Sequence, residues 1–259
     1  MSQSKARLRV GLTEVVETYR RDGFVVVRGV FPEGDRRVLE QELQRYIKNI
    51  VPELPSGEAY FEQSAPESIK ALHNLNRHSE YFSALHLHPT LLQLVRAVLP
   101  EGEVLPTGTS YFAKLAGVGS ATPSHQDNIF QHYDPPLALT LTISLSAAIP
   151  ENGVLICRRG SHQGGLLPHR PSNVLGFSQT LERLPTTAQY PEVPLLLTPG
   201  DISLHHVNTI HYSHANRSGQ DRRQFAIGYR SSLAVRDERR YEEYQEILKR
   251  LHEQSSGRT

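Results

Sequence analysis

The stretch Ser124–Asp127 reads Ser-His-Gln-Asp, and the rest of the predicted fold depends on it. In an extended strand, side chains two positions apart point to the same face, so His125 and Asp127 can reach one metal ion. A third ligand must then come from a distant part of the chain. About eighty residues later, the turn at Pro199–Asp201 leads into a short strand-like run and then to His211. A fold that joins these two regions must place distant strands face to face, as a jelly roll does.

Three other histidines compete with His211 as the third ligand, namely His205, His206 and His214. Since His205 and His206 are adjacent in a strand, at most one of them faces inward. We favour His211 and take His206 as its main rival. If His206 is not a ligand, we expect it to be a core histidine hydrogen-bonded behind the site.

The ligand set of His125, Asp127 and His211 indicates which metal is bound. Two imidazoles and one carboxylate on one face of a metal ion leave the other coordination positions open. This arrangement is typical of non-haem Fe(II) oxygenases and differs from a closed structural site. A His-x-Asp pair by itself is weak evidence in a chain with 13 histidines, so the surrounding motifs decide the interpretation.

The overall composition excludes several classes of protein. The 259 residues carry a formal net charge of +1 with acids and bases interspersed, which argues against a nucleic-acid partner. No apolar run is long enough to span a membrane, and the first residues have no apolar core of a secretory signal. Cys157 is the single cysteine, so no internal disulfide is possible, which fits a reducing compartment. We therefore expect a cytoplasmic protein.

The first part of the chain is predicted to be mainly helical. Amphipathic spacing predicts a helix from Leu12 to Asp22, a second that is capped by Asp35, and a third that begins at Pro89. A short strand is expected at residues 24–27, where valines follow Phe24. Residues 51–66 contain several prolines and a glycine and are predicted to form a loop.

After Pro100 the pattern changes to short β-rich segments separated by Gly, Pro, Asn and Asp. These segments are residues 104–115, 138–146, 154–160, 195–206, 209–215 and 224–232. Glycines and prolines in residues 163–194 exclude a long regular element there and predict a lid over the metal. We expect one domain over residues 1–259, mainly β with flanking helices. Its parts are a helical region of about 1–103, a jelly-roll core of about 104–232 and a C-terminal helix of about 236–253.

A set of short motifs carries a family resemblance. The motifs are His125-Gln126-Asp127, Glu151-Asn152-Gly153, Gly160-Ser161-His162, Pro199-Gly200-Asp201, His211-x-Ser213, Asn216-x-Ser218 and Arg222. In this order and spacing, the stretch from Thr122 to Ser231 resembles the phytanoyl-CoA dioxygenase family of Fe(II)/2-oxoglutarate-dependent oxygenases. The resemblance implies a double-stranded β-helix (a cupin-like jelly roll). It also implies that His125, Asp127 and His211 are the catalytic iron ligands.

The same resemblance implies a site for 2-oxoglutarate, with O2 as the second co-substrate. A dicarboxylate needs a planar donor for its far carboxylate, which favours arginine over lysine. The family places that arginine at Arg222, and the adjacent Arg223 would point the other way in a strand. Ser213 matches a family serine that can bind the same carboxylate. Family members often carry Trp where this chain has Thr140 and Thr142, and either hydroxyl can contact the co-substrate instead.

The implied reaction is hydroxylation of a small molecule, coupled to decarboxylation of 2-oxoglutarate to succinate and CO2. Desaturation, cyclisation and epimerisation use the same ligands and stay open, as does a non-oxidative, cupin-like metal enzyme. A further alternative is a relative without catalytic activity. We expect the substrate residues to include Asn128, Phe130, His132 and Arg158, which favour a polar or anionic small molecule. A shared metal site does not transfer the substrate.

Overall fold

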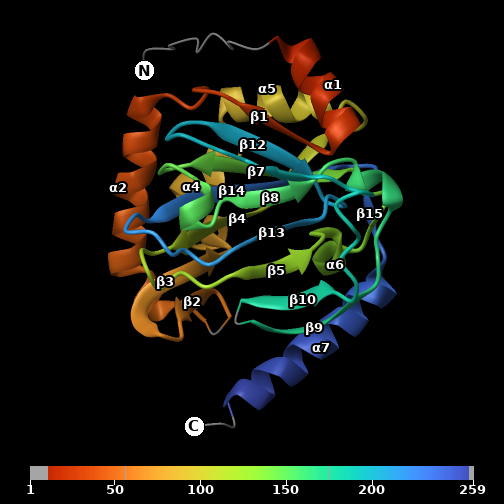
Figure 1. The fold of residues 1–259 in the computed structure, drawn as a ribbon. Helices are drawn as coiled ribbons and strands as arrows, with labels where there is room; N and C mark the ends of the chain where they lie inside the picture. The colour runs from red at the N-terminus through yellow and green to blue at the C-terminus, as the bar shows by residue number, and fades with distance from the viewer. Residues whose placement is uncertain (1–10, 56, 175, 257–259) are drawn as a thin grey trace.

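Two antiparallel sheets face each other, and helices cover the outer side of the larger sheet (Figure 1). The computed structural model describes residues 11–55, 57–174 and 176–256. The first ten residues, where the sequence predicts no secretory signal, lie outside these ranges. The helices are α1 (Leu12–Asp22), α2 (Glu33–Asn49), α3 (Leu75–His78), α4 (Glu80–Leu85), α5 (Pro89–Val98), α6 (Asn128–Gln131) and α7 (Glu238–Ser256). None of these helices in the described ranges combines the length and apolar character that a membrane crossing requires.

Strands from both halves of the chain build the larger sheet. Its order is β1 (Phe24–Val27), β12 (Ile202–His206), β7 (Ala138–Ser144), β14 (Arg222–Ser231), β4 (Val104–Lys114), β3 (Ala65–His73) and β2 (Ala59–Glu62). The smaller sheet has the order β11 (Glu192–Pro194), β8 (Leu155–Arg158), β13 (His211–Ser213) and β5 (Thr122–His125). Strands β6 (Tyr133–Asp134) and β15 (Val235–Arg236) form a separate small pair.

A hairpin of β9 (His169–Val174) and β10 (Phe177–Leu181) continues the smaller sheet beyond β5. The hydroxyl of Thr180 on β10 donates to the carbonyl of Ser124 on β5 at 3.0 Å. The predicted lid region therefore contains two strands docked on the sheet, followed by β11. A role for this region as a lid stays a prediction.

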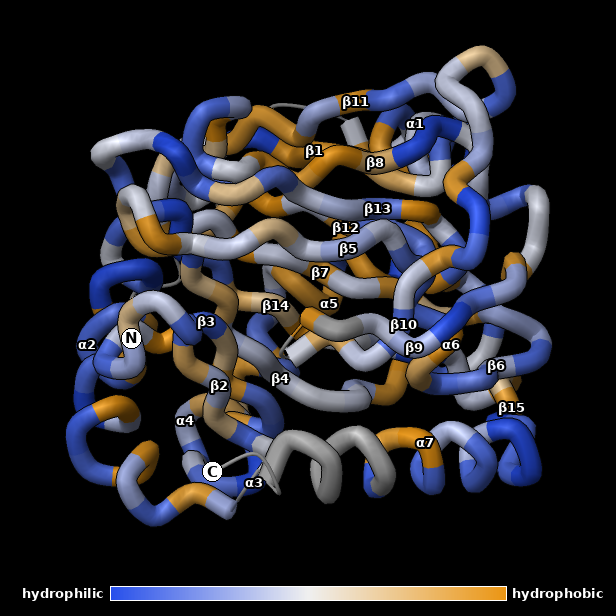
Figure 2. Tube along the Cα trace, turned by 60° about the horizontal axis from the view of Figure 1, so that its bottom comes forward, coloured by the Kyte–Doolittle hydropathy of each residue, from blue (hydrophilic) through white to orange (hydrophobic). Residues whose placement is uncertain are grey.

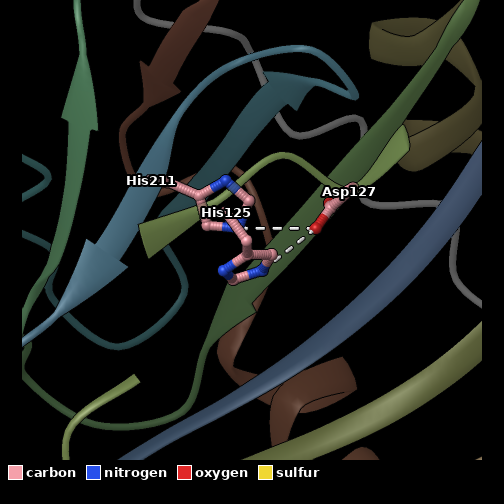
Figure 3. Close-up of side chains that lie close together, drawn as sticks. All are labelled: His125, Asp127 and His211. Carbon is pink, nitrogen blue, oxygen red and sulfur yellow. Dashed lines mark ion pairs between the residues drawn. The ribbon is translucent and has the colours of Figure 1, made fainter. Parts of the chain in front are cut away.

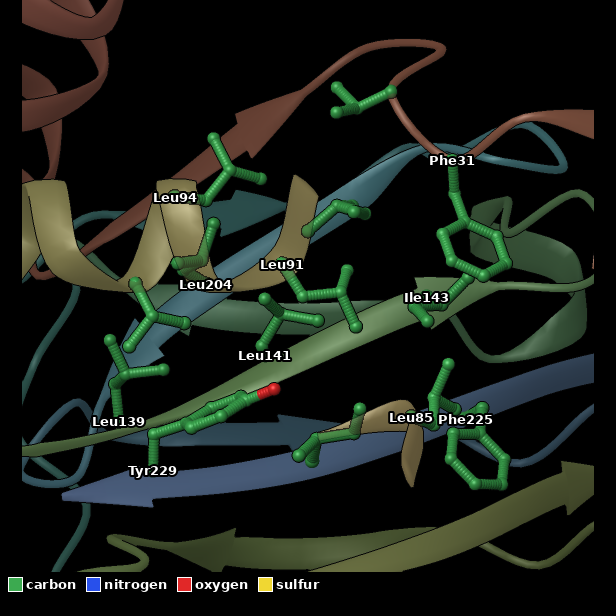
Figure 4. Close-up of a cluster of buried hydrophobic side chains, with 14 of the residues drawn as sticks. Phe31, Leu85, Leu91, Leu94, Leu139, Leu141, Ile143, Leu204, Phe225 and Tyr229 are labelled. Atoms are coloured by element: carbon green, nitrogen blue, oxygen red, sulfur yellow. The ribbon is translucent and has the colours of Figure 1, made fainter. Parts of the chain in front are cut away.

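The two faces of the larger sheet differ in polarity. On β7, Leu139, Leu141 and Ile143 belong to the apolar core beneath the helices. The alternate residues Thr140 and Thr142 therefore point toward the smaller sheet. Figure 4 shows how Leu91 and Leu94 of α5 pack on the apolar face, together with Leu204, Phe225 and Tyr229 from neighbouring strands. Burial of these side chains stabilises the helix layer and leaves a polar space between the sheets.

The Pro199–Asp201 motif is a structural turn at the start of β12. Gly200 has a φ of +88°, and a Cβ there would lie 2.7 Å from the carbonyl oxygen of Phe31. Asp201 accepts hydrogen bonds from the backbone of Gly29 at 2.7 Å and of Thr198 at 2.7 Å. The turn thereby fixes the loop after β1 against the strand that carries His205.

Parts of the predicted secondary structure are wrong. Helix α2 begins at Glu33 after Pro32, so Asp35 lies inside its first turn and is not the cap. The predicted loop at residues 51–66 contains β2 and the start of β3, and the pairing of β3 with β4 holds them in the sheet. The part predicted to be mainly helical therefore supplies β2 and β3 to the larger sheet in addition to the predicted strand β1.

Candidate metal centre

His125, Asp127 and His211 converge between the sheets from two paired strands. His125 ends β5 and lies directly opposite His211 on β13. The Nε2 atoms of both histidines lie 3.4 Å from Oδ1 of Asp127, and the two ring centroids are 4.2 Å apart (Figure 3). Among the described residues, these three side chains form the group of His, Cys, Asp and Glu whose ligand atoms lie within 4.8 Å of one another.

The hydrogen bonds of the two histidines leave the correct nitrogen free for a metal. His125 places Nδ1 at 2.8 Å from the carbonyl oxygen of Pro123, and His211 places Nδ1 at 2.9 Å from that of Thr209. A carbonyl oxygen only accepts, so each Nδ1 carries the proton and each Nε2 presents a lone pair. Burial lowers the pKa of His211 to about 3, which keeps its imidazole in the neutral, metal-binding form.

The second oxygen of Asp127 is held by two donors. Thr140 donates to Oδ2 at 2.7 Å, and Nε2 of His205 lies 3.1 Å from the same oxygen. Burial by itself would raise the pKa of the Asp127 carboxyl. The nearby His211, His125 and His205 outweigh burial and hold this pKa well below its usual value. Asp127 is therefore a carboxylate with Oδ1 turned toward the two free Nε2 atoms, as a facial metal site requires.

The structure reverses the predicted orientations of His205 and His206. His205 is 3% exposed and faces the centre, with its ring centroid 4.5 Å from that of His211. His206 points to the opposite side of β12, where its ring lies near those of Tyr19 and His162. The sequence alone could have predicted these orientations. The apolar Ile202 and Leu204 must face the helices, and His206 lies on the same face of the strand because side chains two positions apart point the same way.

Arg222 lies buried between the sheets without an acidic partner. It is 5% exposed, burial lowers its pKa to about 10, and it donates to Oε1 of Gln224. No carboxylate among the described residues lies within ion-pair distance of its guanidinium. Arg223 points outward and lies 3.4 Å from Glu40, as strand alternation predicts.

Several polar atoms on the faces of β12, β13 and β14 that point between the sheets are buried and lack a hydrogen-bond partner among the described residues. They are Nε of Arg222, Nε2 of Gln224, and the hydroxyls of Ser213 and Ser203. Lys114 lies opposite Arg222 in the β4–β14 register, and burial together with that arginine lowers its pKa to about 6. Buried polar groups normally find partners, so this space fits an anionic, hydrogen-bonding ligand.

The predicted substrate residues are only partly brought together. The ring of Phe130 lies 5.6 Å from that of His125, and His132 lines a cavity of about 380 Å³ beside α7. The amide of Asn128 instead holds the turn at Tyr133, to which it donates at 3.1 Å. Arg158 is wrongly predicted, because its position in β8 turns it to the outer face of the smaller sheet.

The contacts of Arg158 explain its orientation. It donates to the carbonyl of Tyr190 at 3.0 Å, pairs with Glu192 at 3.2 Å and lies over the ring of Tyr212. Its neighbour Cys157 is the residue that pairs with His211 across the sheet. Arg158 therefore ties the edge strand β11 to β8 and does not face the metal ligands.

Comparison with known proteins identifies the family. The model of the phytanoyl-CoA dioxygenase (PhyH) family matches residues 19–224, which include all three ligand candidates and Arg222. The chain belongs to the phytanoyl-CoA dioxygenase family. It is therefore an Fe(II)/2-oxoglutarate-dependent oxygenase with a jelly-roll core, as the motifs predict, with iron as cofactor and 2-oxoglutarate as co-substrate.

The individual relatives of this phytanoyl-CoA dioxygenase family member have low sequence identity to it. A Stutzerimonas stutzeri protein named as a probable alpha-ketoglutarate-dependent hypophosphite dioxygenase is 27% identical over 223 residues, which are 83% of this chain and 77% of that protein. The structure of AviO1 from Streptomyces viridochromogenes Tue57 is 26% identical with a TM-score of 0.68, covering 88% of this chain and 99% of that one. The epimerase SnoN in complex with Fe3+, alpha ketoglutarate and nogalamycin RO shares the fold at 22% identity and a TM-score of 0.69, covering 87% and 85%.

Proposed function

We propose that this oxygenase hydroxylates a small polar or anionic molecule while 2-oxoglutarate is decarboxylated to succinate and CO2. The observation that carries the proposal is Arg222, a buried guanidinium without an acidic partner, in the same polar space as the His125, Asp127 and His211 cluster. A planar donor in such a position suits a carboxylate. Bound iron with 2-oxoglutarate supplies the activation of O2.

Each residue of the proposed site has a distinct role. His125 and His211 would hold iron through Nε2 and Asp127 would hold it through Oδ1, while Thr140 and His205 fix the other oxygen of Asp127. Arg222 and the unpartnered hydroxyl of Ser213 bind the far carboxylate of 2-oxoglutarate. We place Thr142 on the wall of the space between the sheets, because it lies two positions after Thr140 on β7 and faces inward as Thr140 does.

Hydroxylation is favoured over halogenation because a carboxylate occupies the third ligand position. With iron bound, Asp127 would take the ligand position that a halide ion would otherwise need. Desaturation, cyclisation and epimerisation differ from hydroxylation in the fate of oxygen. A reaction under ¹⁸O2 separates them, because hydroxylation places the label in the product whereas the other outcomes do not.

The decisive experiment is an anaerobic titration of metal-free protein with Fe(II) and then 2-oxoglutarate. A visible metal-to-ligand charge-transfer band is expected to grow with 2-oxoglutarate and to be absent in His211→Ala. Arg222→Ala is expected to need at least about tenfold more 2-oxoglutarate for the same band, since a charge-assisted hydrogen bond is lost.

Arg223→Ala is the matched control, because it removes the same side chain from the outward position of the same strand. Its titration should superimpose on that of the unaltered protein. Equal effects of the two arginine variants would contradict the assignment of Arg222. Folded, iron-binding protein that gives no band would contradict the 2-oxoglutarate site itself.

A substrate screen tests the proposed class of small polar or anionic substrates. Succinate release above the substrate-free rate is the readout, and hypophosphite is the first compound to test because of the Stutzerimonas stutzeri relative. Small carboxylic and phosphonic acids come next, each paired with its neutral amide or ester. Stimulation by the neutral compounds and not by the acids would contradict the proposed anionic class.

A further inference from the structure

A cavity of about 380 Å³ lies between the C-terminal helix α7, the short helix α6 and the β9–β10 hairpin. In both Figure 1 and Figure 2, α7 runs along that hairpin at one edge of the molecule. None of the side chains that the structure describes on α7, which are residues 238–249, is fully buried. The helix therefore covers the cavity as a roof without joining the apolar core.

Two features connect this cavity to the proposed iron site. His169 lines the cavity, and its Nε2 lies 3.2 Å from the backbone nitrogen of Gln126, the residue between two of the proposed ligands. Tyr244 of α7 also lines it. The ring centroid of Tyr244 lies 5.8 Å from that of Phe130, which in turn lies 5.6 Å from that of His125. Contacting rings therefore lead from the cavity to a proposed metal ligand.

Polar groups of the cavity lining are available to a ligand. Gln179 on β10 is 4% exposed, and its side chain makes no hydrogen bond to another residue in the ranges that the structure describes. His132, at the end of α6, has a buried Nδ1 that lacks a partner within the same ranges. Native proteins rarely leave a buried amide unpaired, because its desolvation costs free energy. The two N–H donors and the carbonyl acceptor of Gln179 can therefore serve a bound molecule.

The polar groups beside Gln179 are uncharged. Nε2 of His169 accepts a backbone N–H, and its Nδ1 donates to a backbone carbonyl at 2.8 Å, so this imidazole is neutral. Burial, together with the charge of Arg240, lowers the pKa of His132. Arg240 and Glu243 lie at the exposed rim and carry opposite charges. A charged group inside the cavity would lose its hydration without gaining a counter-charge, so the lining favours an uncharged one.

We infer that this cavity binds the part of the substrate that does not react, an uncharged group that carries a hydroxyl or an amide, and that Gln179 recognises this group. The inference rests on the proposed function, because it assigns the remote end of the same substrate. The reacting carbon then lies at the proposed iron site, and the rings of Tyr244 and Phe130 lie along the path between the two ends. Binding energy gained at the remote end positions the reacting carbon. Gln179 is thus a specificity-determining residue.

Probe binding tests the inference without turnover. Benzamide and benzyl alcohol are the uncharged polar probes, benzoate is the charged twin of benzamide, and toluene is the apolar twin. Ligand-observed NMR measures their binding to metal-free protein and to protein loaded with Mn(II), a paramagnetic substitute for iron that shortens the relaxation of nearby probe protons. Gln179→Leu removes the amide at similar volume, and Ile247→Trp fills the cavity from α7. Gln245→Leu, on the exposed side of α7, is the matched control.

The unaltered protein and Gln245→Leu should bind at least one uncharged polar probe at least about fivefold more tightly than benzoate and toluene, as hydrogen bonding to a buried amide predicts. Gln179→Leu should lose this preference and bind toluene no more weakly, and Ile247→Trp should bind none of the probes. Mn(II) should shorten the relaxation of the bound probe in the unaltered protein.

Three outcomes would overturn the inference. They are an unchanged preference in Gln179→Leu, no binding of either polar probe to the unaltered protein, and a bound probe that Mn(II) does not relax. Absence of the charge-transfer band with 2-oxoglutarate from the unaltered protein, with Gln179-dependent binding and Mn(II) relaxation intact, would overturn only the proposed function.

Discussion

At the residue scale, the most informative side chain is one that the sequence motifs do not contain. His205 lies behind Asp127, where its Nε2 shares Oδ2 with the Thr140 hydroxyl. Such outer partners fix the orientation of a carboxylate ligand and its basicity. His205 therefore acts as a positioning residue, because it contacts a proposed metal ligand and not the metal.

His205→Ala is predicted to weaken Fe(II) binding about tenfold or more, because Asp127 would lose one of its two anchors. Competition with a coloured chelator measures the affinity. His206→Ala is the control, since it removes the same side chain from the opposite face of β12 and should change iron affinity little. His205→Gln can restore a donor to Oδ2 and should recover part of the loss. A larger effect at His206 than at His205 would contradict the assignment.

Thr140→Val is predicted to weaken iron binding as well, because it removes the 2.7 Å hydrogen bond to Oδ2 of Asp127. A hydrogen bond to a charged group contributes about 1.5–3 kcal/mol, so a loss of about tenfold or more is expected. Thr142→Val, on the same face of β7, should leave iron affinity unchanged. It should instead raise the concentration of 2-oxoglutarate required for the charge-transfer band. The opposite pattern in the two variants would exchange the proposed roles of the two threonines.

At the element scale, the turn before β12 determines whether His205 reaches the centre. Gly200 adopts a left-handed φ of +88° within van der Waals reach of the Phe31 backbone. Gly200→Ala is therefore predicted to lower the free energy of unfolding by about 1–3 kcal/mol, measured as a shift in the urea midpoint. Gly34→Ala, in the first turn of α2 with open space around it, should be neutral or stabilising by up to about 1 kcal/mol. Equal destabilisation by both would contradict the strain argument.

The elements also show how far the sequence can predict this fold. Amphipathic spacing correctly predicted helices α1 and α5, and short β-rich segments bounded by turn residues correctly predicted β1, β7 and β14. Neither pattern predicted β2 and β3, whose local sequence is rich in turn residues. The strand conformation of β3 comes from pairing with β4, a contact over tens of residues, and β2 in turn pairs with β3.

In the candidate site, too, local motifs predict some residues, whereas others are brought together only by distant contacts. The ligand motif identified His125, Asp127 and His211 because the chemistry of a facial metal site restricts both residue type and spacing. Lys70 and Phe177 belong to no motif. They come close to the metal cluster only because β3 and β10, which belong to two different sheets, bring them together.

At the scale of the whole molecule, several half-buried histidines are held in neutral form. Burial lowers the pKa of His73 and His169 to about 4 and that of His206 to about 3. In the unfolded chain a histidine has a pKa near 6.5. Between pH 6.5 and about 4, the unfolded state therefore binds more protons than the folded state. The stabilisation is present above pH 6.5 and is lost as the pH falls through this window.

Metal-free protein is accordingly predicted to lose stability between pH 7 and pH 5. The limiting slope is roughly 1.4 kcal/mol per pH unit for each such histidine. Urea midpoints at a series of pH values measure it. His206→Asn removes one titrating group and should reduce the slope by roughly one proton, whereas the same change at the exposed His214 should leave it unaltered. His206 and the inward His205 are neighbours on β12. Acid unfolding that begins at His206 would therefore also disturb the contact between His205 and Asp127. A flat midpoint across this range, or equal slopes in the two variants, would contradict the neutral burial of His206.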